Sequence, residues 1–308
     1  YNNLDLSMGC FKMKQKCEPK KIASAAYFLV TLYWGFTAVL MRDALVYMDS
    51  PSYVFLRFGF AGIVMLPFLW KLRRKIKKPA VIKGCVVGCV IGISMQFTVY
   101  SLEFTKVSNS VFFANLSVII VPLIQAVLHK RSPGKYWFIS AAPIVLGLYF
   151  LGGGTSFQLN FGDALCLVSS LLLSVQILVI SRFVTDDDPM VISIFQVLTA
   201  SAIGFAGWGF SGFSGFTLNA HSLMILFLTG VLGTAAAYTC QIHAQKYAGP
   251  TDISMIGSLY PLFGAVGAVL FPDINGIREP ITISLVLGTV LVVAGLLFYA
   301  WKGEAKKQ

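Results

Sequence analysis

The stretch GCVVGCVIGISMQFTVYSLEFTK (84–106) continues as SNSVFFANLSVIIVP (108–122), and this pair of segments decides the fold. It consists of an apolar run rich in small residues, a short polar hinge, and a second apolar run with a proline inside it. The same order returns later as LTGVLGTAAAYTCQIHAQK (228–246) and GPTDISMIGSLYP (249–261). We therefore interpret the chain as two copies of one unit, folded about this pair of hairpins.

Composition indicates that the two copies lie in a membrane. The 308 residues are 56% hydrophobic and only 12% charged, whereas about a quarter of the residues in a soluble domain carry charge. Apolar runs of about 20 residues recur, and a helix of that length crosses about 30 Å of hydrocarbon. Because backbone groups in lipid must bond within their own segment, we expect these runs to be helices.

We expect ten spans, five in each copy. They cover about 22–40, 52–70, 80–101, 109–128, 136–151, 162–181, 189–208, 221–240, 250–271 and 281–301. The predicted regions are an N-terminal cytoplasmic tail (1–21), a first five-helix repeat (22–151), an extracytoplasmic connector (152–161), a second repeat (162–301) and a C-terminal cytoplasmic tail (302–308).

Five spans is an odd number, so the second copy enters the membrane upside down relative to the first. The predicted fold class is therefore an all-α integral membrane protein, with ten transmembrane helices arranged as two inverted five-helix repeats around a central cavity. Inverted repeats with sites near the membrane midplane are typical of secondary transporters.

The net charge is +11, and the basic residues are distributed as this topology requires. With the N-terminus in the cytoplasm, 20 of the 24 Lys and Arg residues fall in cytoplasmic segments and three in outer loops, while Arg57 lies inside a span. Positive charge concentrates on the cytoplasmic side of membrane proteins. We therefore expect a multi-pass protein of the cell membrane with both termini cytoplasmic. The bilayer accounts for the basic residues, so a nucleic-acid partner is not needed, and a monomer and a homodimer both remain open.

The sequence gives little support for a signal peptide or for a metal site. The basic residues before the first span are also typical of a signal peptide, but no small-residue cleavage site follows. None of the six cysteines forms a CxxC pair or a Cys/His metal spacing, so we expect no metal site and no cofactor.

With these elements in place, the chain resembles the drug/metabolite transporter superfamily, and within it the EamA family. The resemblance covers about residues 20 to 301. It is carried by Trp34-Gly35 in the first span, by NFGDAL (160–165) opening the sixth, and by the mid-span Pro122 and Pro261. It implies that helices 1 to 4 and 6 to 9 enclose a central cavity, that helices 5 and 10 pack outside it, and that the substrate is a metabolite such as an amino acid. The second half departs from the pattern, because Ser174-Val175 aligns with Trp34-Gly35.

Polar side chains inside spans are costly and mark candidate sites. Arg57 is the clear intramembrane charge. Its guanidinium suits a carboxylate, although it could instead snorkel to the outer surface. Trp34 shares a helical stripe with Tyr27 and Thr31, and is expected either to form an aromatic cavity wall or to pack in the core.

The other candidates lie in spans three, four, six, eight and nine. Gly84, Gly88 and Gly92 permit close helix approach, and Gln96 and Tyr100 continue their stripe. The further predicted substrate-binding residues are Tyr238, which follows Gly230 and Thr234 in span eight, and Asn115, Gln176 and Tyr260, each of which could instead satisfy a neighbouring backbone group. Pro122 and Pro261 are candidate hinges or gates, because proline frees the carbonyl one turn earlier.

The sequence thus predicts a secondary transporter that moves small organic metabolites, such as amino acids, by alternating access. A carrier of phosphorylated solutes such as nucleotide sugars is the alternative, although it calls for several basic residues in the cavity. A membrane enzyme needs paired acids or a histidine cluster at one depth, and the carboxylates lie at span ends, so we expect no catalytic residues. A non-transporting scaffold or a channel also remains open.

Overall fold

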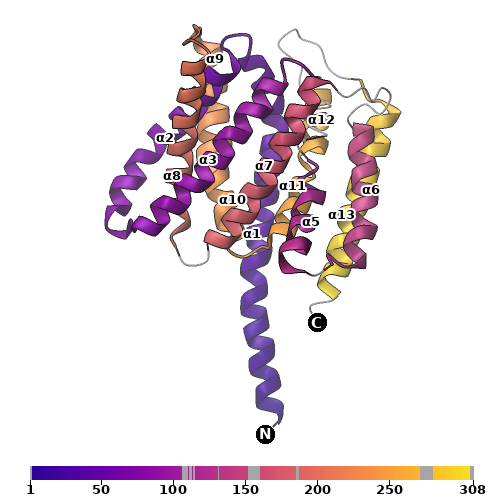
Figure 1. Ribbon diagram of the computed structural model, residues 1–308. Coiled ribbons are helices and arrows are strands. Elements are labelled where there is room, and N and C mark those ends of the chain that lie inside the picture. Colours follow the sequence, from indigo (N-terminus) through magenta and orange to yellow (C-terminus); the bar gives the residue numbers. More distant parts are fainter. Residues whose placement is uncertain are drawn as a thin grey trace.

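The computed structural model describes residues 2–105, 110, 113, 115–130, 132–151, 160–184, 187–270 and 280–305, with the backbone alone for 2–18, 38, 75, 268 and 303–305. Every regular element in these ranges is helical, as predicted. The helices form an elongated bundle in which α6 and α13 stand together at one side (Figure 1).

The described residues of the first half form five α-helices and one 3-10 turn. They are α1 (Asn2–Ala44), α2 (Ser50–Leu72), η1 (Arg73–Lys75), α3 (Lys78–Ser101), α5 (Ser117–His129) and α6 (Lys135–Leu151). Helix α1 begins well before the span expected at 22–40 and includes most of the predicted tail. The predicted start of the fourth span falls largely outside the described residues, and α5 begins only after a turn at Asn115 and Leu116.

In the second half, seven α-helices and one π-helical segment lie among the described residues. They are α7 (Phe161–Phe183), α8 (Pro189–Phe210), α9 (Ala220–Leu226), the π-helix η2 (Phe227–Ala236), α10 (Ala237–Gln245), α11 (Pro250–Gly257), α12 (Tyr260–Leu270) and α13 (Ile283–Ala305). The expected eighth span is one continuous helical segment, α9–η2–α10. The expected ninth span is divided by a turn at Ser258 and Leu259.

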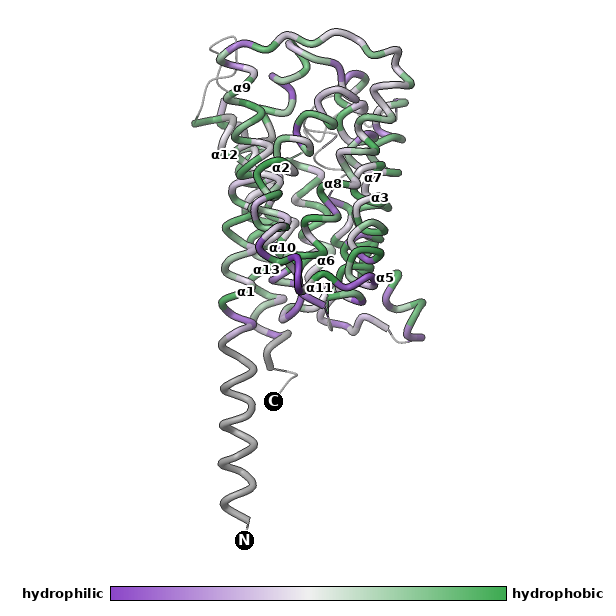
Figure 2. The backbone as a smooth tube through the Cα atoms, turned by 90° about the vertical axis from the view of Figure 1, so that its left-hand side faces the viewer, coloured by the Kyte–Doolittle hydropathy of each residue, from purple (hydrophilic) through white to green (hydrophobic). Residues whose placement is uncertain are grey.

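The length and hydropathy of these helices are those of a multi-pass membrane protein. Six helical segments among the described residues are long and apolar enough to cross a membrane, and α5 and α6 are shorter apolar helices. Apolar residues fill the middle of the bundle and hydrophilic residues gather toward its ends (Figure 2). Large apolar side chains such as Ile63, Val127 and Ile283 are exposed on the outside, where lipid is the natural neighbour.

Side-chain caps define several helix starts. Asp49 accepts from the Ser52 backbone N–H at 3.1 Å and begins α2, while Asn160 and Asp163 form a capping box at the start of α7. The Asp49 carboxylate also accepts hydrogen bonds from Ser211 and Ser214, at 3.2 and 2.5 Å. Burial alone would raise the pKa of Asp49, but these serine hydrogen bonds outweigh it and hold the pKa below its usual value.

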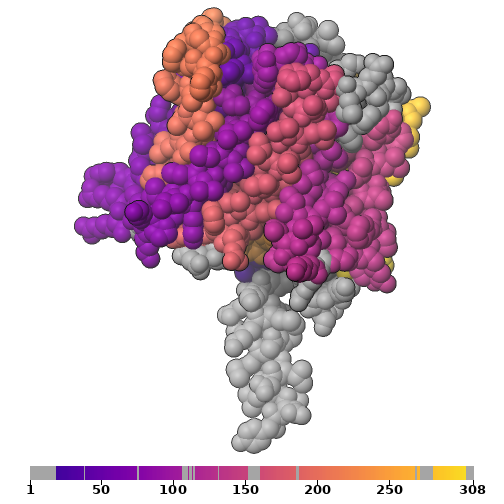
Figure 3. Space-filling view, in the orientation of Figure 1, coloured from indigo at the N-terminus to yellow at the C-terminus, as the bar shows by residue number. Residues whose placement is uncertain are grey.

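The two halves of the chain are interlocked. The most extensive helix pairs, such as α3 with α8, α2 with α8 and α6 with α13, each join a helix of the first half to one of the second. On one face, α3, α7 and the α5–α6 region lie side by side (Figure 3). Glycine permits this approach, because a Cβ on Gly88 of α3 would lie 2.6 Å from the Gln196 carbonyl oxygen of α8.

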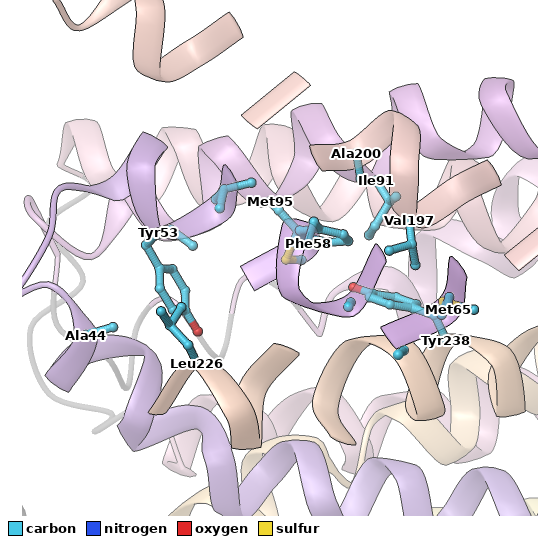
Figure 4. Close-up of a cluster of buried hydrophobic side chains, with 14 of the residues drawn as sticks. Ala44, Tyr53, Phe58, Met65, Ile91, Met95, Val197, Ala200, Leu226 and Tyr238 are labelled. Carbon is cyan, nitrogen blue, oxygen red and sulfur yellow. The ribbon is translucent and has the colours of Figure 1, made fainter. Parts of the chain in front are cut away.

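The largest apolar core cluster joins α2, α3, α8 and the α9–η2–α10 segment. Tyr53, Phe58 and Ile91 are fully buried in it, and Tyr238 packs among its apolar side chains (Figure 4). This cluster fixes α2 against η2, and so positions Arg57, which follows Tyr53 by one helical turn, in the interior of the bundle.

Candidate functional site

A cavity of ≈ 140 Å³ lies inside the bundle, and we call it the central cavity. Side chains from α1, α2, α3, α5, α7, α10, α11 and α12 line it, so helices of both halves contribute. An engineered cavity of about 150 Å³ binds one benzene molecule. The central cavity therefore has room for the core of one small solute.

Six of the eight predicted substrate-binding residues lie on the wall of the central cavity. They are Trp34, Arg57, Asn115, Gln176, Tyr238 and Tyr260. They come from parts of the chain more than 200 residues apart, and the fold brings them to one place.

Gln96 and Tyr100 lie away from the central cavity, contrary to the expectation for their stripe. The Gly84–Gly88–Gly92 stripe of α3 packs against α8, and Gln96 continues this contact by lying against Gly207. Tyr100 is 41% exposed and packs edge-on against Phe104. The cavity face of α3 is turned by about 100°, one residue's rotation, and consists of Met95 and Thr98.

The two prolines also lie outside the central cavity. Helix α5 continues through Pro122, and the interruption before it falls at the Asn115–Leu116 turn. The turn at Ser258 and Leu259 comes directly before Pro261, which cannot donate a hydrogen bond to the carbonyl of Gly257. A helix interruption thus accompanies both proline-bearing segments, at different distances from the proline.

Several cavity residues are additional to the eight predicted substrate-binding residues. Tyr27 and Thr31 belong to the stripe already considered with Trp34 as a cavity wall, and Thr37 lies three residues beyond Trp34 on α1. Gln241 follows Tyr238 by three residues. The α11 wall consists of Ile253, Ser254 and Gly257, which precede Tyr260 at helical spacing. Extending each predicted residue by three or four positions along its helix would have found most of them.

Of the described residues that line the central cavity, Arg57 alone is basic. Its side chain is 5% exposed. Nε donates to Thr234 Oγ1 at 2.8 Å, and Nη2 donates to the Gly233 carbonyl oxygen at 3.4 Å. Both acceptors are neutral, and no ion pair to Arg57 occurs within the described ranges. The guanidinium is therefore a buried positive charge held in place without a carboxylate.

The π-helix η2 supplies the groups that hold Arg57. Trp34 Nε1 donates to the Gly233 carbonyl oxygen at 2.7 Å, and Tyr33 donates its hydroxyl to the Leu228 carbonyl oxygen at 2.9 Å. Thr234 in turn donates to the Thr229 carbonyl oxygen at 2.8 Å. π-Helices are rare and often occur at functional sites. Here the side chains of α1 and α2 bond the carbonyls of η2.

Aromatic rings form the wall beside the guanidinium. The Trp34 ring lies 5.4 Å from that of Tyr238 and 6.2 Å from that of Tyr27, in tilted and edge-on arrangements. Tyr238 also stacks with Phe58 at 6.0 Å. Such faces bind apolar groups and cations.

Two glutamines add unpaired polar atoms to the cavity wall. Gln176 Nε2 and Gln241 Oε1 are buried and have no hydrogen-bond partner among the described residues. Buried polar atoms are nearly always paired, because an unpaired one costs about 1–3 kcal/mol. Among the described lining residues, Gln176 thus carries an unpaired buried donor and Gln241 an unpaired buried acceptor.

The wall offers little that could perform acid–base or metal chemistry. Its described residues include no Asp, Glu, His or Cys. Over the same described ranges, no group of three or more such residues lies close enough to hold a metal ion. The chemistry of the central cavity is that of recognition by charge, hydrogen bonds and aromatic faces.

The sequence is similar to those of membrane transporters. The sequence profile of the EamA-like transporter family matches residues 21–153 and 160–301. An uncharacterized transporter of Archaeoglobus fulgidus is 26% identical over 245 residues, which cover 78% of this chain and 75% of that protein. Protein PagO of Salmonella typhimurium is 23% identical, with 78% and 81% covered, and the uncharacterized transporter YvbV of Bacillus subtilis is 22% identical, with 94% and 95% covered.

A solved structure shares the fold. It is titled "Crystal structure of protein" and superposes with a TM-score of 0.73 over 94% of this chain and 99% of its own, at 17% identity. The helical arrangement described above is therefore one that an independent chain also adopts.

Proposed function

The chain belongs to the EamA-like transporter family, and we propose that this membrane transporter carries small solutes with a carboxylate, such as amino acids, through the central cavity by alternating access. The observation that carries the proposal is Arg57, a buried guanidinium on the cavity wall whose described partners are all neutral.

A buried charge without a counter-ion is unfavourable unless another group compensates it. Thr234 and Gly233 orient the Arg57 guanidinium but do not neutralise it. A carboxylate is the matching anion, because its two oxygens accept the parallel N–H groups of the guanidinium. The solute would thus supply the missing negative charge.

The rest of the wall suits a zwitterion. Gln241 Oε1 is an unpaired acceptor for an ammonium group, and Gln176 Nε2 is an unpaired donor for a second carboxylate contact. The Trp34, Tyr27 and Tyr238 rings provide faces for an ammonium group or an apolar side chain. A cavity of ≈ 140 Å³ limits the solute to a small one.

Alternating access would use the division into two halves. We propose that residues 22–151 and 162–301 are the two inverted five-helix repeats, with both termini in the cytoplasm. The interruptions at Asn115–Leu116 and Ser258–Leu259 lie in the segments that carry Pro122 and Pro261. Bending at these turns would open the cavity to one side at a time.

The alternatives have weaker support from the cavity. A phosphorylated solute would call for several Lys or Arg residues, and the described wall supplies Arg57 alone. A non-transporting scaffold gives no reason for the energetic cost of a buried guanidinium without a counter-ion.

The experiment is flux into proteoliposomes that contain the purified protein. A panel of amino acids, other small carboxylates, amines and phosphorylated sugars would be scored for saturable uptake. We expect saturable uptake of at least one carboxylate solute, and loss of that uptake in Arg57→Gln. Uptake that is confined to phosphorylated solutes, or that survives Arg57→Gln unchanged, would overturn the proposal.

A further inference from the structure

A second cavity of ≈ 620 Å³ lies where α5 ends and α6 begins, and we call it the lateral pocket. Its wall includes Gln125 and His129 of α5, Ser132 before α6, Trp137 in the first turn of α6, and Thr251 and Tyr299 from α11 and α13. It shares no lining residue with the central cavity. It is therefore a separate site between the α5–α11 pair and the α6–α13 pair.

The side chains that remain able to bond there are hydrogen-bond donors. Trp137 is 4% exposed, and its Nε1–H, which can only donate, has no acceptor among the described residues. Gln125 Oε1 accepts from the Thr251 hydroxyl at 2.7 Å, which leaves the amide N–H groups of Gln125 for a ligand. Ser132 Oγ accepts from the Gly134 N–H at 3.4 Å, so its own proton is free to donate.

The charges around the lateral pocket also favour an anion. Trp137 and Thr251 lie in the first turns of α6 and α11, and helix N-termini carry partial positive charge. His129 adds a basic group in the last turn of α5, beside the partially negative C-terminus of that helix. The nearby carboxylate of Asp252 is already engaged, because Lys20 Nζ lies 2.6 Å from it and the Tyr299 hydroxyl lies within 3.5 Å.

We propose that the lateral pocket binds a phosphoryl group. A phosphate offers acceptor oxygens to the indole, amide and hydroxyl donors at once. The same chemistry is available from the headgroup of an anionic lipid or from a soluble phosphate ester. Exposed apolar side chains of the adjoining turns, Val127, Leu128, Phe138 and Ile139, would contact acyl chains if the group belongs to a lipid.

Binding in the lateral pocket would connect helices that the proposed alternating access would move relative to one another. Helices α5 and α11 also supply Ser117 and Ser254 to the central cavity. A phosphoryl group held by Gln125 and Trp137 would bridge these helices to the α6–α13 pair, and so brace the cavity wall from outside.

The test uses delipidated, detergent-purified full-length protein. Native mass spectrometry and thermal unfolding would measure binding of phosphatidylglycerol, phosphatidylcholine and glycerol 3-phosphate. The variants are Trp137→Phe, which removes the indole donor but keeps an aromatic ring, and Gln125→Glu, which keeps the acceptor for Thr251 and adds a repelling charge. Trp301→Phe is the matched control, because Trp301 is exposed on α13 outside the pocket.

We expect saturable binding of phosphatidylglycerol that weakens roughly tenfold or more in each pocket variant, as loss of a hydrogen bond to a charged group implies, and that is unchanged in Trp301→Phe. Equivalent behaviour with glycerol 3-phosphate alone would identify a soluble phosphate as the occupant. Absence of saturable binding for all three compounds, or equal affinity in wild type and both folded pocket variants, would overturn the proposal.

Discussion

Replacing Thr234 with valine removes the hydroxyl that links Arg57 to the π-helix η2. That hydroxyl accepts from Arg57 Nε at 2.8 Å and donates to the Thr229 carbonyl oxygen at 2.8 Å, and the Thr234 side chain is fully buried. Valine keeps the shape but leaves a charged donor and a carbonyl unpaired. A hydrogen bond to a charged group contributes about 1.5–3 kcal/mol and a neutral one about 1 kcal/mol. The expected loss is therefore about 2–4 kcal/mol.

The assay is thermal unfolding of purified wild type and variant in one detergent. With about 2–4 °C per kcal/mol for a chain of this class, Thr234→Val should unfold roughly 4–16 °C below wild type.

The control is Thr229→Val, which alters an equally buried threonine of the same element. The Thr229 hydroxyl donates only to the Ile225 carbonyl four residues earlier, at 2.7 Å, so its loss should change the unfolding temperature much less. Equal unfolding temperatures for the two variants would refute the inference that η2 anchors the guanidinium.

Two further substitutions test packing and charge. Gly88→Ala should destabilise by about 1–3 kcal/mol, because the new Cβ would lie 2.6 Å from the Gln196 carbonyl oxygen, whereas Gly215→Ala, which meets nothing within 4 Å, should not change the unfolding temperature. Asp49 has a lowered folded-state pKa, so its stabilisation should be complete above about pH 4, its unfolded value, and decline as the pH falls through the folded pKa. Asp49→Asn should flatten that acid-side decline in a pH series of unfolding temperatures, and an unaltered decline would contradict the assignment.

The helical secondary structure was predictable from the sequence, because long apolar runs can satisfy their backbone in lipid only as helices. The family was predictable from particular residues, such as Trp34-Gly35 and the NFGDAL segment (160–165). The positions where those helices are interrupted were not. The side chains of Tyr33, Trp34 and Arg57 donate to carbonyls of the π-helix η2, and these residues lie about 175 to 200 positions earlier in the chain. Such long-range contacts leave no local pattern.

The candidate site was predictable where polarity inside a span was the signal, as for Arg57 and Gln176. Gln96 was expected to line the cavity, but the rotation of α3 about its own axis turns this residue away from it. The glycine stripe of α3 makes the close helix contact expected of it, with α8, and Gln96 continues that stripe and therefore lies against α8. The cavity face of α3 then falls one residue away, at Met95.

The most direct measurement compares a matched pair of solutes, an amino acid that the protein transports and its carboxamide. The two differ in one group, the carboxylate that Arg57 would bind. Competition for saturable uptake in proteoliposomes should show that the amide binds at least roughly tenfold more weakly, since it lacks the charge-assisted pair, and that Arg57→Gln largely removes the difference. Equal competition by both solutes in the wild-type protein would contradict a carboxylate site at Arg57.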